Sequence, residues 1–439
     1  MQEVIKRTLA ELDIVSKEKP IKVISHFDAD GITSAAIFSR ALQRMHKPFT
    51  LQIVKTLDEE TIKKLPEDQT LVFLDLASAS LDYLAKKKTQ AFIFDHHEIT
   101  QNIPPNVRMV NPTIQNHEIC SGAAVAYLAA KSMSEENKDL ANLAVIGMVG
   151  DQFTENIGKV YDQILKDASI TVRKGLLLYP STRPLDKALE YSTSFYIPGV
   201  TGSFKGVLEL LRDAKIERGN TGYKSLAELT DEEMSRLITA IMLRSIGESQ
   251  SSSLIGNLFI TKFFNRLEDI REISALINAC SRMGHPEAAL GFCLGNKQSK
   301  QQAEGIYIEY KQSISNALRF IEENNNTIHG KNYKIINAQD KIKDTIIGTA
   351  ASIMSYSPLY PQGTIIIAMA YDQDRIKVSA RLVGKKGRNV RELLSSVIVP
   401  LSGEVGGHPE AAGGLISRDK EQELLTQLKS TLEIEVVKV

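Results

Sequence analysis

The sequence has no tryptophan and only three cysteines among its 439 residues. Cys120, Cys280 and Cys293 lie far apart without a CxxC spacing, which argues against a disulfide framework and against a structural zinc site. We therefore expect reduced and buried thiols. Without tryptophan, any stacking on a nucleobase must use Tyr, Phe, His or Arg.

The chain also has no net charge, because 53 Lys and Arg residues balance 53 Asp and Glu residues. This balance argues against a protein that coats duplex DNA by bulk electrostatics, but it leaves room for a local basic groove. No stretch approaches the roughly 20 apolar residues that a membrane span needs, and the N-terminal MQEVIKRTLAELD forms a charged helical pattern rather than a signal peptide. We expect a cytoplasmic protein without a membrane partner.

Over about the first 165 residues, short apolar runs alternate with amphipathic helical patterns, which predicts an α/β domain with a parallel sheet. The expected strands span residues 21–25, 50–55, 71–75 and 91–95. Helical patterns separate or follow them, for example over 33–47 and 121–134. Polar residues cluster where these strands end, and ligands usually bind at that edge of an open α/β sheet.

The strand signals fade between about residues 188 and 322, and the sequence there predicts mainly helices, among them 207–211, 231–244 and 268–283. Beyond residue 326 the α/β alternation returns, with apolar runs at 364–370 and 376–380 and a helix at 390–396. The predicted organisation is a catalytic α/β domain over 1–187, a helical connecting region over 188–325 and a smaller α/β domain over 326–439.

Residues able to bind a metal follow the first expected strand. His26, Asp28 and Asp30 alternate along the chain, so one imidazole and two carboxylates can project on one side of the strand end. Gly31 permits the tight turn into the next helix. Taken alone, this motif is also compatible with an Asp that merely caps the helix beside a solvated loop.

Three further motifs strengthen the metal interpretation. Asp75 ends the third expected strand, and Asp95, His96 and His97 end the fourth. An apolar helix with small residues, 143–150, delivers Asp151 at its end. A lone histidine at such a place would more often be structural, but together the motifs bring acidic and imidazole groups to one edge of one sheet.

Four clustered carboxylates would repel one another in a partly buried cleft unless cations neutralised them. They are Asp28, Asp30, Asp75 and Asp151. Two divalent ions supply the matching charge. The mixed set of oxygen and imidazole donors suits manganese(II) best, with magnesium, cobalt and zinc as alternatives.

These motifs, in this order, resemble the DHH phosphoesterase superfamily, whose name is the tripeptide Asp95-His96-His97. The resemblance implies that His97 faces the scissile phosphate and that Asp95 orients its neighbours. It also implies one ion on His26 and Asp28, a second on Asp30, His96 and Asp151, and Asp75 as the bridge between them. Asn111-Pro112 and Ser121-Gly122-Ala123 resemble the RecJ-type version of the domain, which makes Ser121 a candidate substrate-binding residue.

The C-terminal part resembles the DHH-associated domain that binds substrate. The segment 406–414 is similar to its glycine-rich loop, in which Gly406 and Gly407 let backbone N–H groups approach a phosphate and His408 adds a donor. Arg381 is similar to an arginine that this domain offers to phosphate. A basic stripe could continue the contact with the nucleic-acid backbone, although a solvated face explains it equally well. Its members are Lys385, Lys386, Arg388 and Arg391.

The segment 271–283 is similar to the archaeal RecJ-like branch, so the resemblance covers nearly the whole chain. It implies a metal-dependent exonuclease that releases mononucleotides from single-stranded DNA or RNA in replication or repair. A GINS-type replication factor or a repair helicase is the implied protein partner. Two rivals are a phosphodiesterase for small substrates, such as nano-RNA, a cyclic dinucleotide or a nucleotide phosphate, and a helicase-associated scaffold without catalysis.

Overall fold

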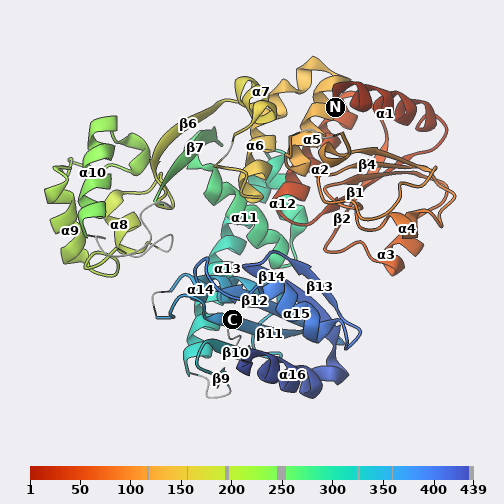
Figure 1. Ribbon diagram of the computed structural model, residues 1–439. Helices are drawn as coiled ribbons and strands as arrows, with labels where there is room; N and C mark the ends of the chain where they lie inside the picture. The colour runs from red at the N-terminus through yellow and green to blue at the C-terminus, as the bar shows by residue number, and fades with distance from the viewer. Residues whose placement is uncertain are drawn as a thin grey trace. The chain divides into compact units, whose positions relative to one another are not determined.

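The computed structural model describes residues 1–115, 118–155, 157–192, 197–244, 254–323, 327–357 and 359–434. Tertiary contacts divide the chain into two compact units, Met1–Tyr307 and Ile308–Val439 (Figure 1). The predicted three-part division at residues 187/188 and 325/326 stays a prediction. Each unit is described by itself below.

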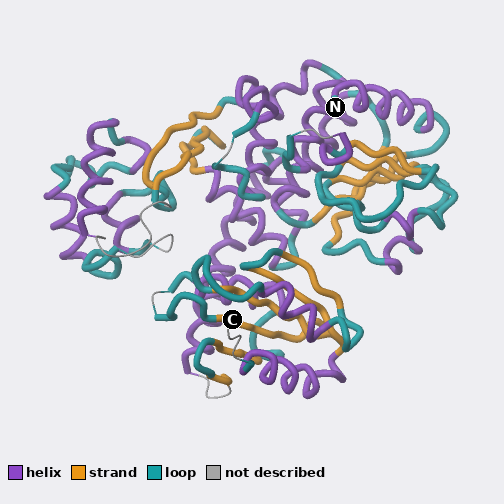
Figure 2. Tube along the Cα trace, in the orientation of Figure 1, coloured by secondary structure: helices purple, strands orange, loops and turns teal. Residues whose placement is uncertain are grey.

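The first unit contains a five-stranded parallel sheet in the order β2-β1-β3-β4-β5 (Figure 2). Its strands are β1 (Ile21–His26), β2 (Phe49–Val54), β3 (Thr70–Leu74), β4 (Ala91–Phe94) and β5 (Val107–Val110). The predicted parallel α/β sheet is therefore confirmed. β5 was not predicted from the sequence, because it has only four residues and includes the charged Arg108.

Helices cover both faces of this sheet because alternate strand residues point to opposite sides. On one face, Val72 and Leu74 pack in a core with residues of α1 (Gln2–Val15), α2 (Ala29–Arg44), α5 (Gly122–Met133) and α6 (Ala141–Gly150). On the other face, Leu71 and Phe73 pack in a core with residues of the short α3 (Glu59–Lys63) and α4 (Leu81–Leu84).

The middle of the chain contains a small sheet that the sequence interpretation missed. β6 (Ile170–Leu176), β7 (Ile255–Phe263) and β8 (Arg266–Asp269) form an antiparallel three-stranded sheet. The expectation that strands fade after residue 188 is therefore wrong for β7 and β8. β7 pairs with β6, which lies about 80 residues earlier, and β8 pairs with β7 across a short hairpin. The pairing of β6 with β7 is a long-range feature that local periodicity does not reveal.

Helices make up most of the rest of this region, as predicted. α8 (Leu185–Glu190), α9 (Phe204–Asp213) and α10 (Asp231–Arg244) share a separate apolar core. α7 (Lys159–Asp167) precedes the small sheet, and α11 (Ile270–Arg282), α12 (Pro286–Cys293) and the long α13 (Lys297–Glu323) follow it. No helix within the described ranges combines the length and the apolar composition that crossing a membrane requires.

The second unit is built on a six-stranded mixed sheet in the order β13-β14-β12-β11-β10-β9. The strands are β9 (Thr327–His329), β10 (Tyr333–Asn337), β11 (Ile365–Asp372), β12 (Arg375–Leu382), β13 (Glu404–Gly407) and β14 (Ala411–Ser417). The helices are α14 (Asp344–Ser355), α15 (Val390–Ile398) and α16 (Glu421–Glu433). The smaller C-terminal α/β domain is thus confirmed as a fold. The glycine-rich segment expected as a loop is a hairpin of β13 and β14.

All three cysteines are buried and unpaired, as expected from their spacing. Burial raises the pKa of the Cys120 and Cys280 thiols to about 12. They therefore stay protonated near neutral pH and behave as small apolar side chains.

Candidate metal centre

The candidate centre lies where β1, β3 and β4 end, because parallel strands bring their carboxyl ends to one edge of the sheet. His26 is the last residue of β1, Asp75 directly follows β3, and Asp95 directly follows β4. α2 begins at this edge, and its N-cap Asp28 accepts a hydrogen bond from the Gly31 N–H at 3.0 Å. A Cβ at Gly31 would lie 2.3 Å from the His26 carbonyl oxygen, so the turn from strand to helix requires glycine there.

The predicted ligands form two groups of three, each with its donor atoms within 4.8 Å of one another. In the first group, His26 Nδ1 lies 2.9 Å from Asp28 Oδ2 and 3.7 Å from Asp75 Oδ2. In the second group, His96 Nε2 lies 3.1 Å from Asp151 Oδ2 and 3.8 Å from Asp30 Oδ2.

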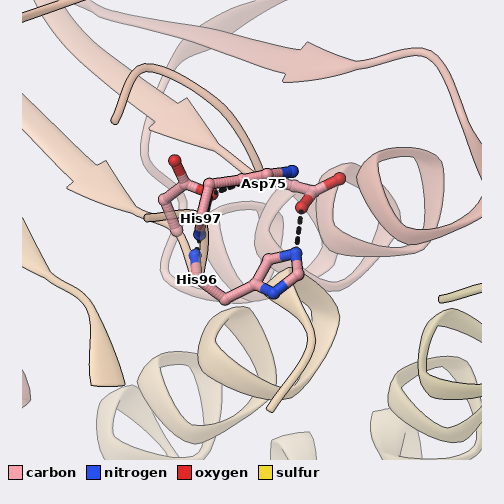
Figure 3. A group of neighbouring side chains, drawn as sticks. Asp75, His96 and His97 are labelled. Carbon is pink, nitrogen blue, oxygen red and sulfur yellow. Dashed lines mark hydrogen bonds and ion pairs between the residues drawn. The ribbon is translucent and has the colours of Figure 1, made fainter. Parts of the chain in front are cut away.

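Asp75 lies between the two groups. Its Oδ1 is 3.3 Å from His96 Nε2, and Figure 3 shows the His96 imidazole directed at this carboxylate. Its Oδ2 lies on the side of His26, 3.7 Å from Nδ1. The residue is 1% exposed and has a φ of +57°, a left-handed conformation that costs energy in a residue other than glycine. The fold therefore holds this carboxylate in a strained position where it can contact both groups.

Asp30 is fully buried and is held by the beginning of α5. Its two carboxylate oxygens accept hydrogen bonds from the N–H groups of Gly122, at 2.5 Å, and of Ala123, at 3.0 Å. Helix N-termini stabilise such an anion. A Cβ at Gly147 of α6 would lie 2.4 Å from Asp30 Oδ1, so only glycine lets that helix pack this closely.

Asp95 and His97 also have ligand atoms within 4.8 Å of those of Asp75 and His96, and Asp95 supports the loop that follows β4. Its Oδ1 accepts a hydrogen bond from the His96 N–H at 2.8 Å and lies 2.8 Å from His97 Nδ1. Its Oδ2 accepts from the Ser78 hydroxyl at 2.5 Å, and Asn111 donates to the His97 carbonyl oxygen at 2.9 Å. The His97 side chain is 54% exposed, so it can meet a ligand from solution.

The donor atoms fit a divalent metal. His26 Nδ1, Asp75 Oδ1 and His96 Nε2 are buried and lack a hydrogen-bond partner within the described part of the chain. The nearby carboxylates are close enough for contact but outside hydrogen-bonding geometry. Buried polar atoms are normally satisfied, and a cation bound by oxygen and imidazole ligands would satisfy these.

The electrostatics lead to the same conclusion. Burial, followed by repulsion from Asp75 and Asp151, raises the pKa of Asp30 well above its usual value. Burial alone would lower the pKa of His96, but the carboxylates of Asp151 and Asp75 outweigh it and raise that pKa to about 11. Without metal, a proton on His96 thus offsets the crowded negative charge that a cation would otherwise offset.

Burial raises the pKa of Asp151 as well, while the same effect on Asp28 is outweighed by His26, so the pKa of Asp28 falls to about 2. At His97, the hydrogen bond to Asp95 raises the pKa more than burial lowers it. The two ends of the centre therefore differ: Asp28 is ionised near neutral pH, whereas Asp30 and Asp151 hold protons more strongly than ordinary carboxyls.

The predicted substrate residues of the second unit lie on or next to β12, β13 and β14. Arg381 on β12 donates to the Ser352 hydroxyl at 2.8 Å and to the Ala412 carbonyl oxygen at 3.3 Å. Gly406 and Gly407 end β13, and His408 is exposed in the following turn. Gly407 has a φ of +122°, which favours glycine at the turn.

The predicted basic residues after β12 differ in exposure and in contacts. Lys385, Lys386 and Arg391 are exposed, whereas Arg388 donates to the Thr431 carbonyl oxygen at 2.9 Å. In the first unit, Ser121 is fully buried, and its hydroxyl caps α5 by accepting from the Ala124 N–H at 3.3 Å. The structure thus gives Ser121 a capping contact and does not bring it to the surface.

Two polar contacts of the site were not predicted from the sequence. Ser78 holds Asp95, and Asn278 of α11 accepts a hydrogen bond from the Ala29 N–H at 2.9 Å. Ser78 follows a strand end as many loop serines do, so no local signal singles it out. Asn278 stands in the segment that resembles the RecJ-like branch, but nothing in that segment indicates its partner.

Comparison with protein families matches three successive parts of the chain. Residues 20–148 match the DHH family, N-terminal domain, residues 178–259 the DHH-CID domain, and residues 330–433 the DHHA1 domain. The chain belongs to the DHH superfamily of phosphoesterases. The tripeptide Asp95-His96-His97 lies in the first of these matches, and Arg381 and His408 lie in the third.

One relative and two solved structures are similar to this DHH protein over nearly its whole length. The uncharacterized protein MJ0831 of Methanocaldococcus jannaschii is 27% identical over 432 residues, which cover 93% of this chain and 92% of the relative. RecJ from Thermus thermophilus, solved in complex with Mn²⁺, is 17% identical with a TM-score of 0.61. The match covers 98% of this chain but only 55% of that RecJ, so the chain spans about half its length.

CDC45 from Entamoeba histolytica has a TM-score of 0.65 at 12% identity, and the match covers 99% of each chain. At these identities, the two solved structures show a shared fold. This DHH protein is therefore RecJ-like in fold, and CDC45 shares that fold.

Proposed function

We propose that this chain is a metal-dependent exonuclease that hydrolyses the phosphodiester bonds of single-stranded DNA or RNA from an end and releases mononucleotides. The observation that carries the proposal is the pair of donor groups that Asp75 joins. A pair of cations bound by two such adjoining donor groups would suit phosphoryl transfer, and nucleases and phosphatases use such pairs.

The proposed ligands would bind two ions. His26 and Asp28 would hold one ion, Asp30, His96 and Asp151 the other, and Asp75 both. Such ions, when bound, supply Lewis acidity and an activated water for attack on phosphorus. We propose manganese(II), because the donor set mixes imidazole with carboxylate.

The protein's own groups position the reaction. Asp95 fixes the His97 ring through Nδ1, which leaves the exposed side of the ring to donate a hydrogen bond to a phosphoryl oxygen. A donor that is fixed in advance stabilises negative charge as it develops without reorganising. In the second unit, Arg381 and His408 would bind phosphates of the substrate, with Lys385 and Arg388 as further contacts. Contacts to the backbone of a nucleic acid carry no sequence specificity.

The likeness to CDC45 supports a second candidate role, attachment to replication machinery. A GINS-type replication factor or a repair helicase is the proposed partner. The described site supports catalysis over a pure scaffold, because the six proposed ligands lie in groups whose donor atoms are within 4.8 Å of one another. Two imidazole nitrogens and a carboxylate oxygen among them are buried and lack hydrogen bonds within the described part of the chain. A scaffold has no need of that arrangement.

The test is digestion of single-stranded DNA and RNA of about 5 and about 40 nucleotides, the latter well above the roughly 4–16 nucleotides that a single-strand site covers. Each strand carries a label at one end or the other, and Mn²⁺ is added or withheld. We expect Mn²⁺-dependent release of mononucleotides from the long strands by the wild type and none by Asp75→Asn. Asn is chosen because it tolerates the left-handed backbone.

Other outcomes would change the assignment. Cleavage confined to the short strands would favour a phosphodiesterase for small substrates. Absence of metal-dependent cleavage on every strand, by a protein that melts cooperatively, would leave the helicase-associated scaffold.

A further inference from the structure

α11 lies outside the segment that matches the DHH family, yet it contacts the turn that carries two of the proposed ligands. Asn278 Oδ1 accepts a hydrogen bond from the backbone N–H of Ala29 at 2.9 Å, across 249 positions of sequence. Ala29 stands between Asp28 and Asp30 and is 1% exposed. The bond therefore fixes the peptide that joins the two carboxylates.

The same helix approaches the second turn of the centre. α11 packs against α6 as well as α2. A Cβ at Gly150, the residue before Asp151, would lie 3.1 Å from Ser274 Oγ and 2.9 Å from the Ala29 Cβ. Ser274 and Asn278 are four positions apart and so lie on one face of α11. One helix face thus contacts both turns that lead into Asp30 and Asp151.

The beginning of α11 is itself held firmly. Asp269 is fully buried and caps the helix by accepting from the Arg271 N–H at 2.9 Å, and it also accepts from the Ser181 N–H at 2.9 Å. The Arg271 guanidinium donates to Asp269 and to the carbonyl oxygens of Leu177 and Leu178. The helix is therefore anchored independently of the metal centre, as a support must be.

We propose that Asn278 is a positioning residue of the metal centre, which holds the Asp28–Asp30 turn in the geometry that binds two ions. The proposal rests on the proposed metal-dependent function. Without Asn278, the buried Ala29 N–H would lose its hydrogen-bond acceptor, and the turn would shift to bring this N–H to another acceptor. Residues that orient metal ligands typically contribute 10–100-fold to metal affinity, so about a tenfold effect is expected.

The experiment measures Mn²⁺ affinity by calorimetric titration and the melting temperature in EDTA, for full-length protein and three variants. Asn278→Leu removes the acceptor and keeps the branching of the side chain, and Asn278→Asp keeps an oxygen there. Asn142→Leu is the matched control, because Asn142 on α6 accepts the Ser169 N–H at 2.8 Å. It lies nine residues before Asp151, about 13 Å along the helix.

We expect Asn278→Leu to bind Mn²⁺ about tenfold or more weakly and Asn278→Asp to bind at least as tightly as the wild type. Asn142→Leu should lower the melting temperature in EDTA and leave Mn²⁺ affinity unchanged. If Asn278→Leu does not fold, Asn278→Ala replaces it, since water can then reach the Ala29 N–H, and the same loss of affinity is expected.

Wild-type affinity in the Leu or Ala variant would overturn the positioning role. So would an equal loss in the Asp variant, or an equal loss in Asn142→Leu, because either would show a general effect on the fold. A wild-type protein that binds no Mn²⁺ would overturn the proposed function itself and the positioning role with it. The two failures are distinguished by the wild type alone.

Discussion

The candidate metal centre of the first unit and the glycine-rich hairpin of the second differ in how far their polar residues are buried. At the centre, Asp30 and Asp75 are buried and nearly in contact with other charged groups. At the hairpin, His408 is exposed and a Cβ at Gly406 would meet nothing within 4 Å. Crowded charges need a rigid surround, whereas groups that meet a long flexible ligand need open space. The following substitutions test this contrast.

The largest expected effect is the loss of catalysis in a variant of the candidate metal centre, compared with weaker substrate binding in a variant of the hairpin. Asp75→Asn should lower kcat by about three orders of magnitude or more, as the loss of a residue central to a reaction does. His408→Ala should raise KM about tenfold and leave kcat nearly unchanged, because it removes one uniform contact to the substrate. Steady-state kinetics on labelled single strands give both parameters. A fall in kcat as large in His408→Ala as in Asp75→Asn would remove the contrast.

Loss of the buried charge of Asp269 should change the free energy of unfolding more than loss of the exposed charge of Asp340. Only the first change should depend on pH. Burial opposes ionisation of Asp269, but hydrogen bonds from Arg271 outweigh it and lower the pKa. The ionised form therefore stabilises the fold above the unfolded-state pKa of about 4, and this stabilisation is lost as pH falls through the folded-state value. Asp269→Asn should reduce the free energy of unfolding by about 3 kcal/mol at neutral pH.

Urea unfolding at pH 7 and at pH values below about 4 measures this effect, and the difference between Asp269→Asn and the wild type should shrink in acid. The control is Asp340→Asn in the second unit, where the Asp340 carboxylate lies 3.8 Å from Arg418 and is 75% exposed. Less than about 1 kcal/mol is expected there. A difference for Asp269→Asn that does not change with pH would refute the role of its ionisation.

Gly147 at the candidate metal centre and Gly406 in the hairpin differ in the space that an added methyl group would have. At Gly147, an added methyl would meet Asp30 Oδ1 at 2.4 Å and the Ala123 Cβ at 2.5 Å. Gly147→Ala should therefore destabilise the protein by about 1–3 kcal/mol, despite the better helix propensity of alanine. Gly406→Ala should change stability by less than about 0.5 kcal/mol. Thermal melts of both variants decide, and equal effects would contradict the packing described here.

The smallest effect is expected in the basic stripe. Lys385 is exposed, so it can add one screened charge contact, and Lys385→Ala should raise KM only a few-fold. The change should be larger at low salt, because screening weakens exposed charges. Measuring KM at two salt concentrations tests this. An effect that is independent of salt would assign Lys385 a role other than attraction of phosphate.

The sequence predicted those parts of the fold and site that depend on local pattern. Apolar runs followed by His26, Asp75 and Asp95 indicated strands that end at a common edge, and the structure has them there. β7 was missed because its pairing with β6 is long-range, and β8 was missed because it pairs with β7 and so depends on that strand. The contacts that hold Asp30 and Ala29 also join distant segments, and an Asn on a helix gives no local sign of its partner.

The bond between Asn278 and Ala29 also bears on the order of synthesis. A ribosome completes all six proposed ligands once it has passed Asp151, but α11 follows more than 100 residues later. Until then the nascent chain holds the carboxylates without the support that α11 gives to their turns. Fragments truncated before Ile270 would share this lack. A full set of ligands in an incomplete chain is therefore not yet a complete centre.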